Sequence, residues 1–70
     1  MTLGERLIQL RAKAGLNQDT LAEQLGVSRQ SVSKWENDAS VPDLEKLVKL
    51  SAVFGVSLDE LVKGEVPDSA

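Results

Sequence analysis

A glycine followed two residues later by a serine constrains the fold of this chain more than any other feature. Gly26 can adopt the left-handed conformation that ends a helix, because it has no Cβ to clash with the backbone. Ser28 is a favoured residue for capping the start of the next helix. Two helices over 18–25 and 29–37 are therefore expected to meet at a very short turn and to cross steeply.

The rest of the 70-residue chain has similar start and stop signals. Thr2 and Glu5 can form a capping box for a first helix that Gly15 ends. Asn17 is the expected cap of the helix that precedes Gly26. No segment reads as a strand, so the predicted class is all-α with a single compact domain over 1–63. The five expected helices span about 2–14, 18–25, 29–37, 43–54 and 58–63, and residues 64–70 read as a tail or the start of a linker.

Apolar residues at helical spacing identify the expected core. Ala22 lies four residues before Gly26, where a larger side chain would block the close approach of the second helix. Trp35, the one tryptophan, is interpreted as a core residue that packs against the fourth helix. The other expected core positions are Leu3, Leu7, Leu10, Ala14, Leu21, Leu25, Val27, Val32, Leu44, Leu47, Val48, Ser51 and Phe54.

The absence of both cysteine and histidine excludes several functional classes. The usual general base, thiol nucleophile and zinc ligands are missing, and the serines have no visible activating partner. We therefore expect no enzyme activity, no metal and no cofactor, and no small-molecule ligand can be inferred. No apolar run approaches the ~18 residues of a membrane span, which favours a cytoplasmic protein without membrane association.

A net charge of −3 does not by itself favour nucleic acid as a partner, but the charge is unevenly distributed. Residues 1–37 carry five bases and four acids, whereas residues 38–70 carry three bases and seven acids. The excess of acid therefore belongs to the second half. Local charge matters more than net charge, because the Debye length at physiological salt is only about 8 Å.

The outward side of the 29–37 helix is expected to carry long hydrogen-bonding side chains. Arginine and lysine can donate to the O6 and N7 atoms of guanine, and glutamine can pair with adenine through two hydrogen bonds. The helix thus has side chains suited to reading base edges, and the N-terminus of a helix favours anions. The expected base-reading residues are Arg29, Gln30, Ser33 and Lys34. Gln30 and Lys34 are favoured over Ser33 in this role, and a DNA phosphate is the alternative partner of Arg29.

The chain resembles the phage repressor and Cro type of helix-turn-helix regulators, also called the xenobiotic-response-element family. The matching text is LRAKAGLNQDTLAEQLGVSRQSVSKWEN, followed after four residues by PDLEKLVKLSAVFGVSLDELV. The resemblance implies a five-helix, lambda-repressor-like DNA-binding domain with its helix-turn-helix motif over 18–37 and its recognition helix over 29–37. It also implies a transcriptional regulator, most simply a repressor, that binds a palindromic operator in double-stranded DNA as a homodimer.

The same resemblance assigns further roles by position. It implies an ion pair between Arg11 and Glu36 that fixes the recognition helix to the scaffold. It also implies that phosphates are held by Asn17, Gln18 and Asn37, with Ser28 and Ser31 as helpers.

One departure from the family pattern follows the recognition helix. Family members often have a glycine and then a basic residue there, whereas this chain has Asp38 and Ala39. An aspartate at this place is expected to lie close to the phosphates and to weaken binding by the loop, which would increase the reliance on dimerisation. The departure and the acidic second half also support an alternative, a protein-binding antitoxin or adaptor module with the same fold.

Overall fold

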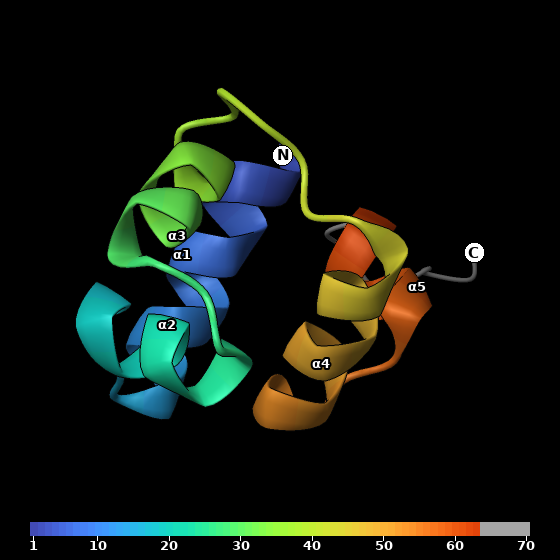
Figure 1. The fold of residues 1–70 in the computed structure, drawn as a ribbon. Helices are drawn as coiled ribbons and strands as arrows, with labels where there is room; N and C mark the ends of the chain where they lie inside the picture. Colours follow the sequence, from blue (N-terminus) through green and yellow to red (C-terminus); the bar gives the residue numbers. More distant parts are fainter. Residues whose placement is uncertain (64–70) are drawn as a thin grey trace, which may run out of the picture.

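The computed structural model describes residues 1–63, which form five helices and no strand (Figure 1). The predicted all-α, five-helix class is therefore confirmed, while the tail predicted over 64–70 lies outside the described residues. Within residues 1–63, no helix combines the length and the apolar character that a membrane crossing requires. The helices are α1 (Leu3–Ala14), α2 (Gln18–Leu25), α3 (Arg29–Glu36), α4 (Leu44–Phe54) and α5 (Leu58–Lys63).

Local capping explains where the first three helices begin and end. Thr2 and Glu5 form the predicted capping box, in which each side chain accepts a hydrogen bond from the backbone N–H of the other. Asn17 and Ser28 cap α2 and α3, as predicted. Gly26 ends α2 at a φ of 73°, a left-handed conformation that favours glycine. The turn between α2 and α3 thus forms for the reasons that the sequence indicates.

The fifth helix begins with a second capping box, which Ser57 and Glu60 form. The Ser57 N–H donates to Glu60 Oε1, and the Glu60 N–H donates to the Ser57 hydroxyl oxygen. The hydrogen bonds from Ser57 lower the pKa of the Glu60 carboxyl group, because they stabilise its ionised form. Arg6 of α1 reaches the same turn through a hydrogen bond from its Nε to the carbonyl oxygen of Glu60.

The core lies where α1 and α2 meet α3, α4 and α5. Helix α1 contacts α3, α4 and α5, and α2 contacts α3 and α4. Trp35 belongs to this core and is 6% exposed. The residues with less than 2% exposure are Leu7, Leu21, Leu25, Val32, Leu50 and Leu61.

The predicted inner stripe of α4 is wrong in two of its positions. Leu44 and Val48 are exposed at 70% and 48%, whereas Leu50 is completely buried. Leu47 and Phe54 do pack against the core. Because α4 is apolar on more than one side, its spacing alone cannot determine which side faces inward. Ala14 is also exposed rather than buried, since α1 contributes its buried leucines earlier in the helix.

Candidate nucleic-acid interface

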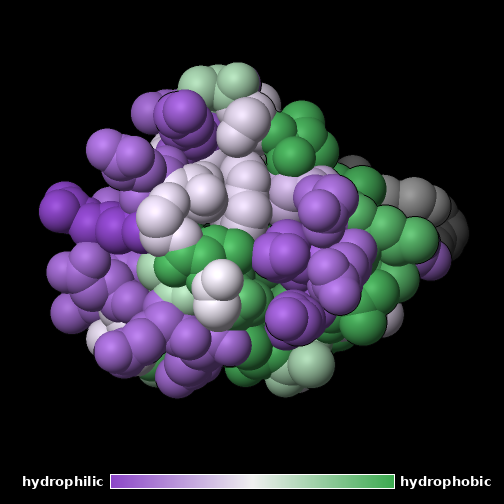
Figure 2. All heavy atoms as spheres, viewed as in Figure 1, coloured by the Kyte–Doolittle hydropathy of each residue, from purple (hydrophilic) through white to green (hydrophobic). Residues whose placement is uncertain are grey.

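Helix α3 has two sides with opposite character. Val32, Trp35 and Glu36 are its buried residues. Arg29, Gln30 and Lys34, three of the four expected base readers, are exposed, and Ser33 is half-buried. Figure 2 shows hydrophilic side chains over the side of the molecule where α2 and α3 lie. The outward side of α3 therefore presents donors and acceptors to a partner, while the other side holds the helix in place.

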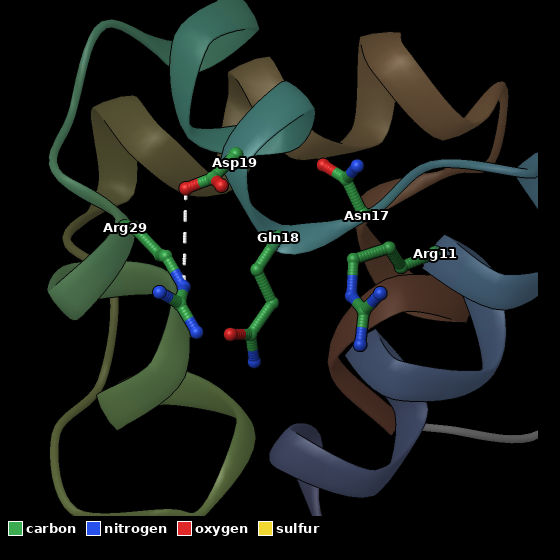
Figure 3. Close-up of a pocket in the computed structure, with 5 residues that line it drawn as sticks. All are labelled: Arg11, Asn17, Gln18, Asp19 and Arg29. Carbon is green, nitrogen blue, oxygen red and sulfur yellow. Dashed lines mark ion pairs between the residues drawn. The ribbon is translucent and has the colours of Figure 1, made fainter.

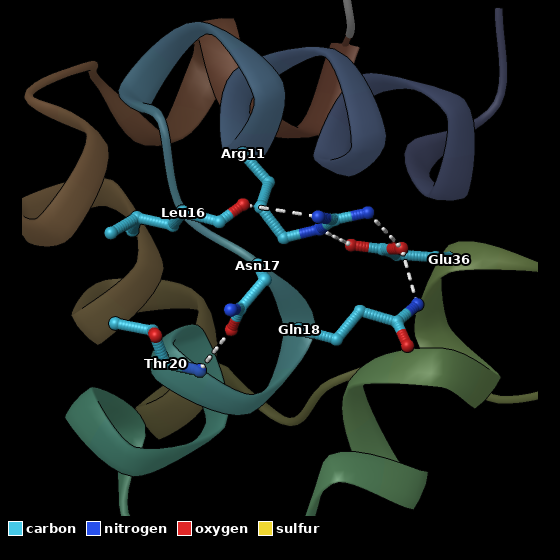
Figure 4. A network of polar contacts seen from close by, with 6 residues as sticks. All are labelled: Arg11, Leu16, Asn17, Gln18, Thr20 and Glu36. Carbon is cyan, nitrogen blue, oxygen red and sulfur yellow. Dashed lines mark hydrogen bonds and ion pairs between the residues drawn. The ribbon is translucent and has the colours of Figure 1, made fainter.

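A buried carboxylate at the end of α3 connects this helix to α1 and α2 (Figure 4). The Glu36 side chain is 5% exposed, and Arg11 Nε lies 2.6 Å from its Oε2. Arg11 Nη2 donates to Oε1 at 3.1 Å, so the two side chains pair through two hydrogen bonds. Gln18 Nε2 also donates to Oε1, at 2.8 Å. The ion pair that the resemblance implied is thus part of a larger network.

Arg11 has a further partner in the chain that leads into α2. Its Nη1 donates to the carbonyl oxygen of Leu16 at 3.0 Å. The hydrogen bonds to Glu36 raise the pKa of Arg11, with a smaller contribution from the charge of Glu36, while burial acts in the opposite direction. Arg11 therefore stays ionised, and it connects α1 both to the end of α3 and to the chain that leads into α2.

Most of the residues expected to bind phosphate also cap a helix or turn. The side-chain oxygens of Asn17 and Asn37 accept from the backbone N–H groups of Thr20 and Ala39. Since each amide oxygen is used internally, the amide NH2 is the group left to donate to an anion. Ser28 accepts from the N–H of Ser31, and their hydroxyl oxygens lie 3.2 Å apart.

A cavity of about 390 Å³ lies between the start of α2 and the start of α3 (Figure 3). It brings together two expected phosphate ligands, Asn17 and Gln18, and one expected base reader, Arg29. The remaining lining residues are Arg11 and Asp19. Asn37, at the opposite end of α3, does not line this cavity.

A close contact between α1 and the end of α3 was not predicted. Gly4 is buried, and a Cβ built on it would lie 2.5 Å from the carbonyl oxygen of Glu36 and 2.7 Å from that of Trp35. Only glycine fits this approach without displacement. A glycine weakens the helix that contains it, so its presence in a first turn needs another reason. Close packing against a second element is such a reason.

Asp38 also takes part in the contact between α1 and the end of α3. Its φ of 63° is left-handed, a conformation that favours glycine and that aspartate adopts more readily than most other residues. Asp38 Oδ1 accepts a hydrogen bond from the N–H of Gly4 at 3.0 Å, next to the positive end of the α1 dipole. The aspartate therefore has a structural partner that sequence analysis missed.

The comparison with known families identifies this arrangement. A family model described as helix-turn-helix matches residues 7–61, which run from α1 to α5. The chain belongs to the phage repressor and Cro type of helix-turn-helix regulators. The matched range includes both α2 and α3, the two helices that are predicted to form the helix-turn-helix motif.

Individual relatives agree with this membership. The transcriptional activator BcrR of Enterococcus faecalis is 48% identical over 65 residues, which are 93% of this chain and 32% of that protein. The prophage-derived regulator YonR of Bacillus subtilis (strain 168) is 46% identical over 61 residues, which are 87% of this chain and 56% of YonR. The helix-turn-helix chain therefore spans about a third of one relative and a little over half of the other.

A solved structure shows the same fold. The c2 repressor of phage P22, crystallised with a synthetic operator, gives a TM-score of 0.88 at 35% identity. The match covers 93% of this chain and 98% of that chain. The likeness extends over nearly the whole of both helix-turn-helix domains.

Proposed function

We propose that this domain binds double-stranded DNA in a sequence-specific manner, with α3 in the major groove. The observation that carries the proposal is the division of α3 into a buried side and an exposed side. Burial of Val32 and Trp35 fixes the helix, while Arg29, Gln30 and Lys34 stay exposed. Together with Ser33 these side chains are the proposed readers of base edges.

Phosphates on either side of the groove are the proposed partners of the helix ends. Asn17 and Gln18 stand at the start of α2, where free backbone N–H groups also favour an anion. The Gln18 amide has two hydrogens, so one remains for phosphate when the other binds Glu36. Asn37, at the end of α3, is the third proposed phosphate ligand, and Ser28 and Ser31 are the proposed helpers at the start of α3.

The biological output proposed for this binding is control of transcription. The most direct mechanism is repression, in which the bound domain occupies a promoter. The P22 c2 protein is named as a repressor and was solved with an operator, which supports this proposal. BcrR is named as an activator, so a reporter gene placed behind the selected operator is the measurement that assigns the direction.

Selection of bound duplexes from a random DNA pool, followed by substitution of the readers, tests the proposal. Gln30→Ala and Lys34→Ala are each expected to weaken operator binding about 5- to 150-fold, because each removes a contact worth roughly 1–3 kcal/mol. Titrations at several salt concentrations measure this loss, and the parent affinity should fall as salt rises.

The control for these two variants is Lys13→Ala, which removes an exposed lysine from α1 rather than from α3. It is expected to bind the operator nearly as tightly as the parent. If Gln30→Ala and Lys34→Ala also bind like the parent, α3 is not the reading helix.

We also propose that two copies bind a palindromic operator, with half-sites about one helical turn (~10 bp) apart. Figure 2 shows apolar side chains gathered on the side of α4 and α5. The exposed apolar residues there are Val41, Leu44, Val48, Leu58 and Val62. Exposed Glu45 and Lys49 give α4 both signs of charge, which suits a two-fold interface where one surface meets itself.

Leu44→Glu tests this dimer surface. Because Leu44 is 70% exposed, the substitution is expected to leave the fold intact. Affinity for an operator with two half-sites should fall about 10- to 100-fold, while affinity for one half-site stays the same. Ile8→Glu, which places the same charge on exposed Ile8 of α1, is the matched control. Parent-like binding of Leu44→Glu to the two-site operator would exclude this surface.

A further inference from the structure

An exposed ion pair joins the two helices of the motif beside the cavity. Arg29, the first residue of α3, places its Nε 3.8 Å from Oδ1 of Asp19 in the first turn of α2 (Figure 3). Within residues 1–63 it is the one ion pair between α2 and α3. The Arg29 and Asp19 side chains are 66% and 75% exposed, so the pair contributes little to stability.

The carboxylate of Asp19 affects which groups of the DNA the Arg29 guanidinium can bind. A DNA phosphate is an anion, and its approach to the guanidinium brings it close to the negative charge of Asp19. The O6 and N7 atoms of guanine are uncharged acceptors, so they meet much less repulsion. Asp19 faces the Arg29 Nε, which leaves the two terminal nitrogens of the guanidinium for a bidentate contact.

We propose that Asp19 is a specificity-determining residue, which disfavours phosphate as a partner of Arg29 and so directs that side chain to a guanine edge. This inference rests on the proposed function, in which Arg29 lies in the major groove. Asp19 reduces binding to wrong sequences more than it reduces binding to the operator. Specificity of this kind depends on a repulsive element as well as on attractive contacts.

Asp19→Asn tests the proposal by removing the charge while keeping the size of the side chain. Affinity for a duplex of random sequence is expected to rise about 3- to 10-fold, while affinity for the selected operator changes less. The slope of log affinity against log salt on the random duplex should steepen by about 0.9, the value expected for one more phosphate contact. In a selection, the preference for guanine at the base pair that Arg29 reads should weaken.

Two further variants separate this local effect from a general effect of charge. Glu23→Gln removes one negative charge from an exposed position on the same helix, and Glu23 has no ion pair with Arg29. It is expected to change the affinity for random DNA by less than twofold. In an Arg29→Ala background, Asp19→Asn is expected to have no effect beyond that of Glu23→Gln.

The outcomes distinguish this inference from the proposed function. If the parent selects a defined operator but Asp19→Asn behaves like Glu23→Gln, the role of Asp19 is overturned and the proposed function stands. An Asp19→Asn effect that persists in the Arg29→Ala background overturns the role of Asp19 in the same way. If the parent selects no sequence, the proposed function fails, and the inference fails with it.

Discussion

Replacing Arg11 by methionine is expected to lower the free energy of unfolding by about 3–5 kcal/mol. Methionine retains an apolar chain of similar length but leaves the buried Glu36 carboxylate without its cationic partner. Gln18 is the one other side chain that donates to Glu36 within residues 1–63, and a neutral amide cannot balance the charge. A domain of this size has a stability of roughly 3–5 kcal/mol, so the variant should be largely unfolded at 25 °C.

Urea denaturation followed by circular dichroism and by the fluorescence of buried Trp35 measures this loss. Lys13→Met, at an exposed position on the same helix, is the matched control and should change stability by less than about 0.5 kcal/mol. Adding Glu36→Leu to the Arg11 variant should restore much of the stability, because no buried charge remains. A loss below about 1 kcal/mol in Arg11→Met would show that Glu36 does not depend on this arginine.

Gly4→Ala is expected to destabilise the domain by about 1–3 kcal/mol, although alanine is the better helix former. The new methyl group would lie 2.5 Å and 2.7 Å from two backbone carbonyl oxygens at the end of α3. These atoms belong to a helix that is itself fixed in the core, so they cannot move aside without disturbing Trp35 and Glu36.

Gly4→Ala is a sharp test, because the close contact and helix propensity predict changes in stability of opposite sign. Helix propensity alone predicts that Gly4→Ala stabilises the protein by roughly 1 kcal/mol, so a thermal melt with a higher midpoint than the parent would contradict the close contact. Gln9→Ala, at an exposed position of the same helix, reports the effect of propensity without a clash. It should shift the free energy of unfolding by no more than about 0.5 kcal/mol.

The helix boundaries could be predicted because their signals are local. The capping box at Thr2, the caps at Asn17 and Ser28 and the left-handed Gly26 each act over three or four residues. Their hydrogen bonds join residues that are close in the sequence, so local residue types are enough to predict them. The sequence therefore predicted the five helices to within a residue or two.

Features set by tertiary contact were harder to predict. The inward side of α4 depends on which of its apolar residues meets the other helices, and the choice of Leu50 over Val48 has no local cause. The hydrogen bond from the Gly4 N–H to Asp38 joins residues 34 positions apart, so no periodic pattern in the sequence indicates it. Only the glycine in the first turn of α1 was a signal, and it indicated close packing without naming the partner.

The features of the candidate site also differ in whether the sequence could predict them. Exposure of Arg29, Gln30 and Lys34 follows from helical periodicity once Val32 and Trp35 are placed in the core. The pairing of Arg11 with Glu36 came instead from the family resemblance, because two charges 25 positions apart cannot be matched by spacing. The ion pair between Asp19 and Arg29 was not predicted, because an acidic residue in a first helical turn usually needs no partner beyond the helix dipole.

The two-sided character of α3 separates its outward positions from the residues that hold it in the fold. Within residues 1–63, the side chains of Gln30, Ser33 and Lys34 take part in no hydrogen bond or ion pair. The residues that hold α3 to the scaffold are a separate set, made of Val32, Trp35 and Glu36. New combinations of residues at the three outward positions can therefore be screened as a library on a constant scaffold. Under the proposed function, such a library would yield domains that bind other chosen DNA sequences.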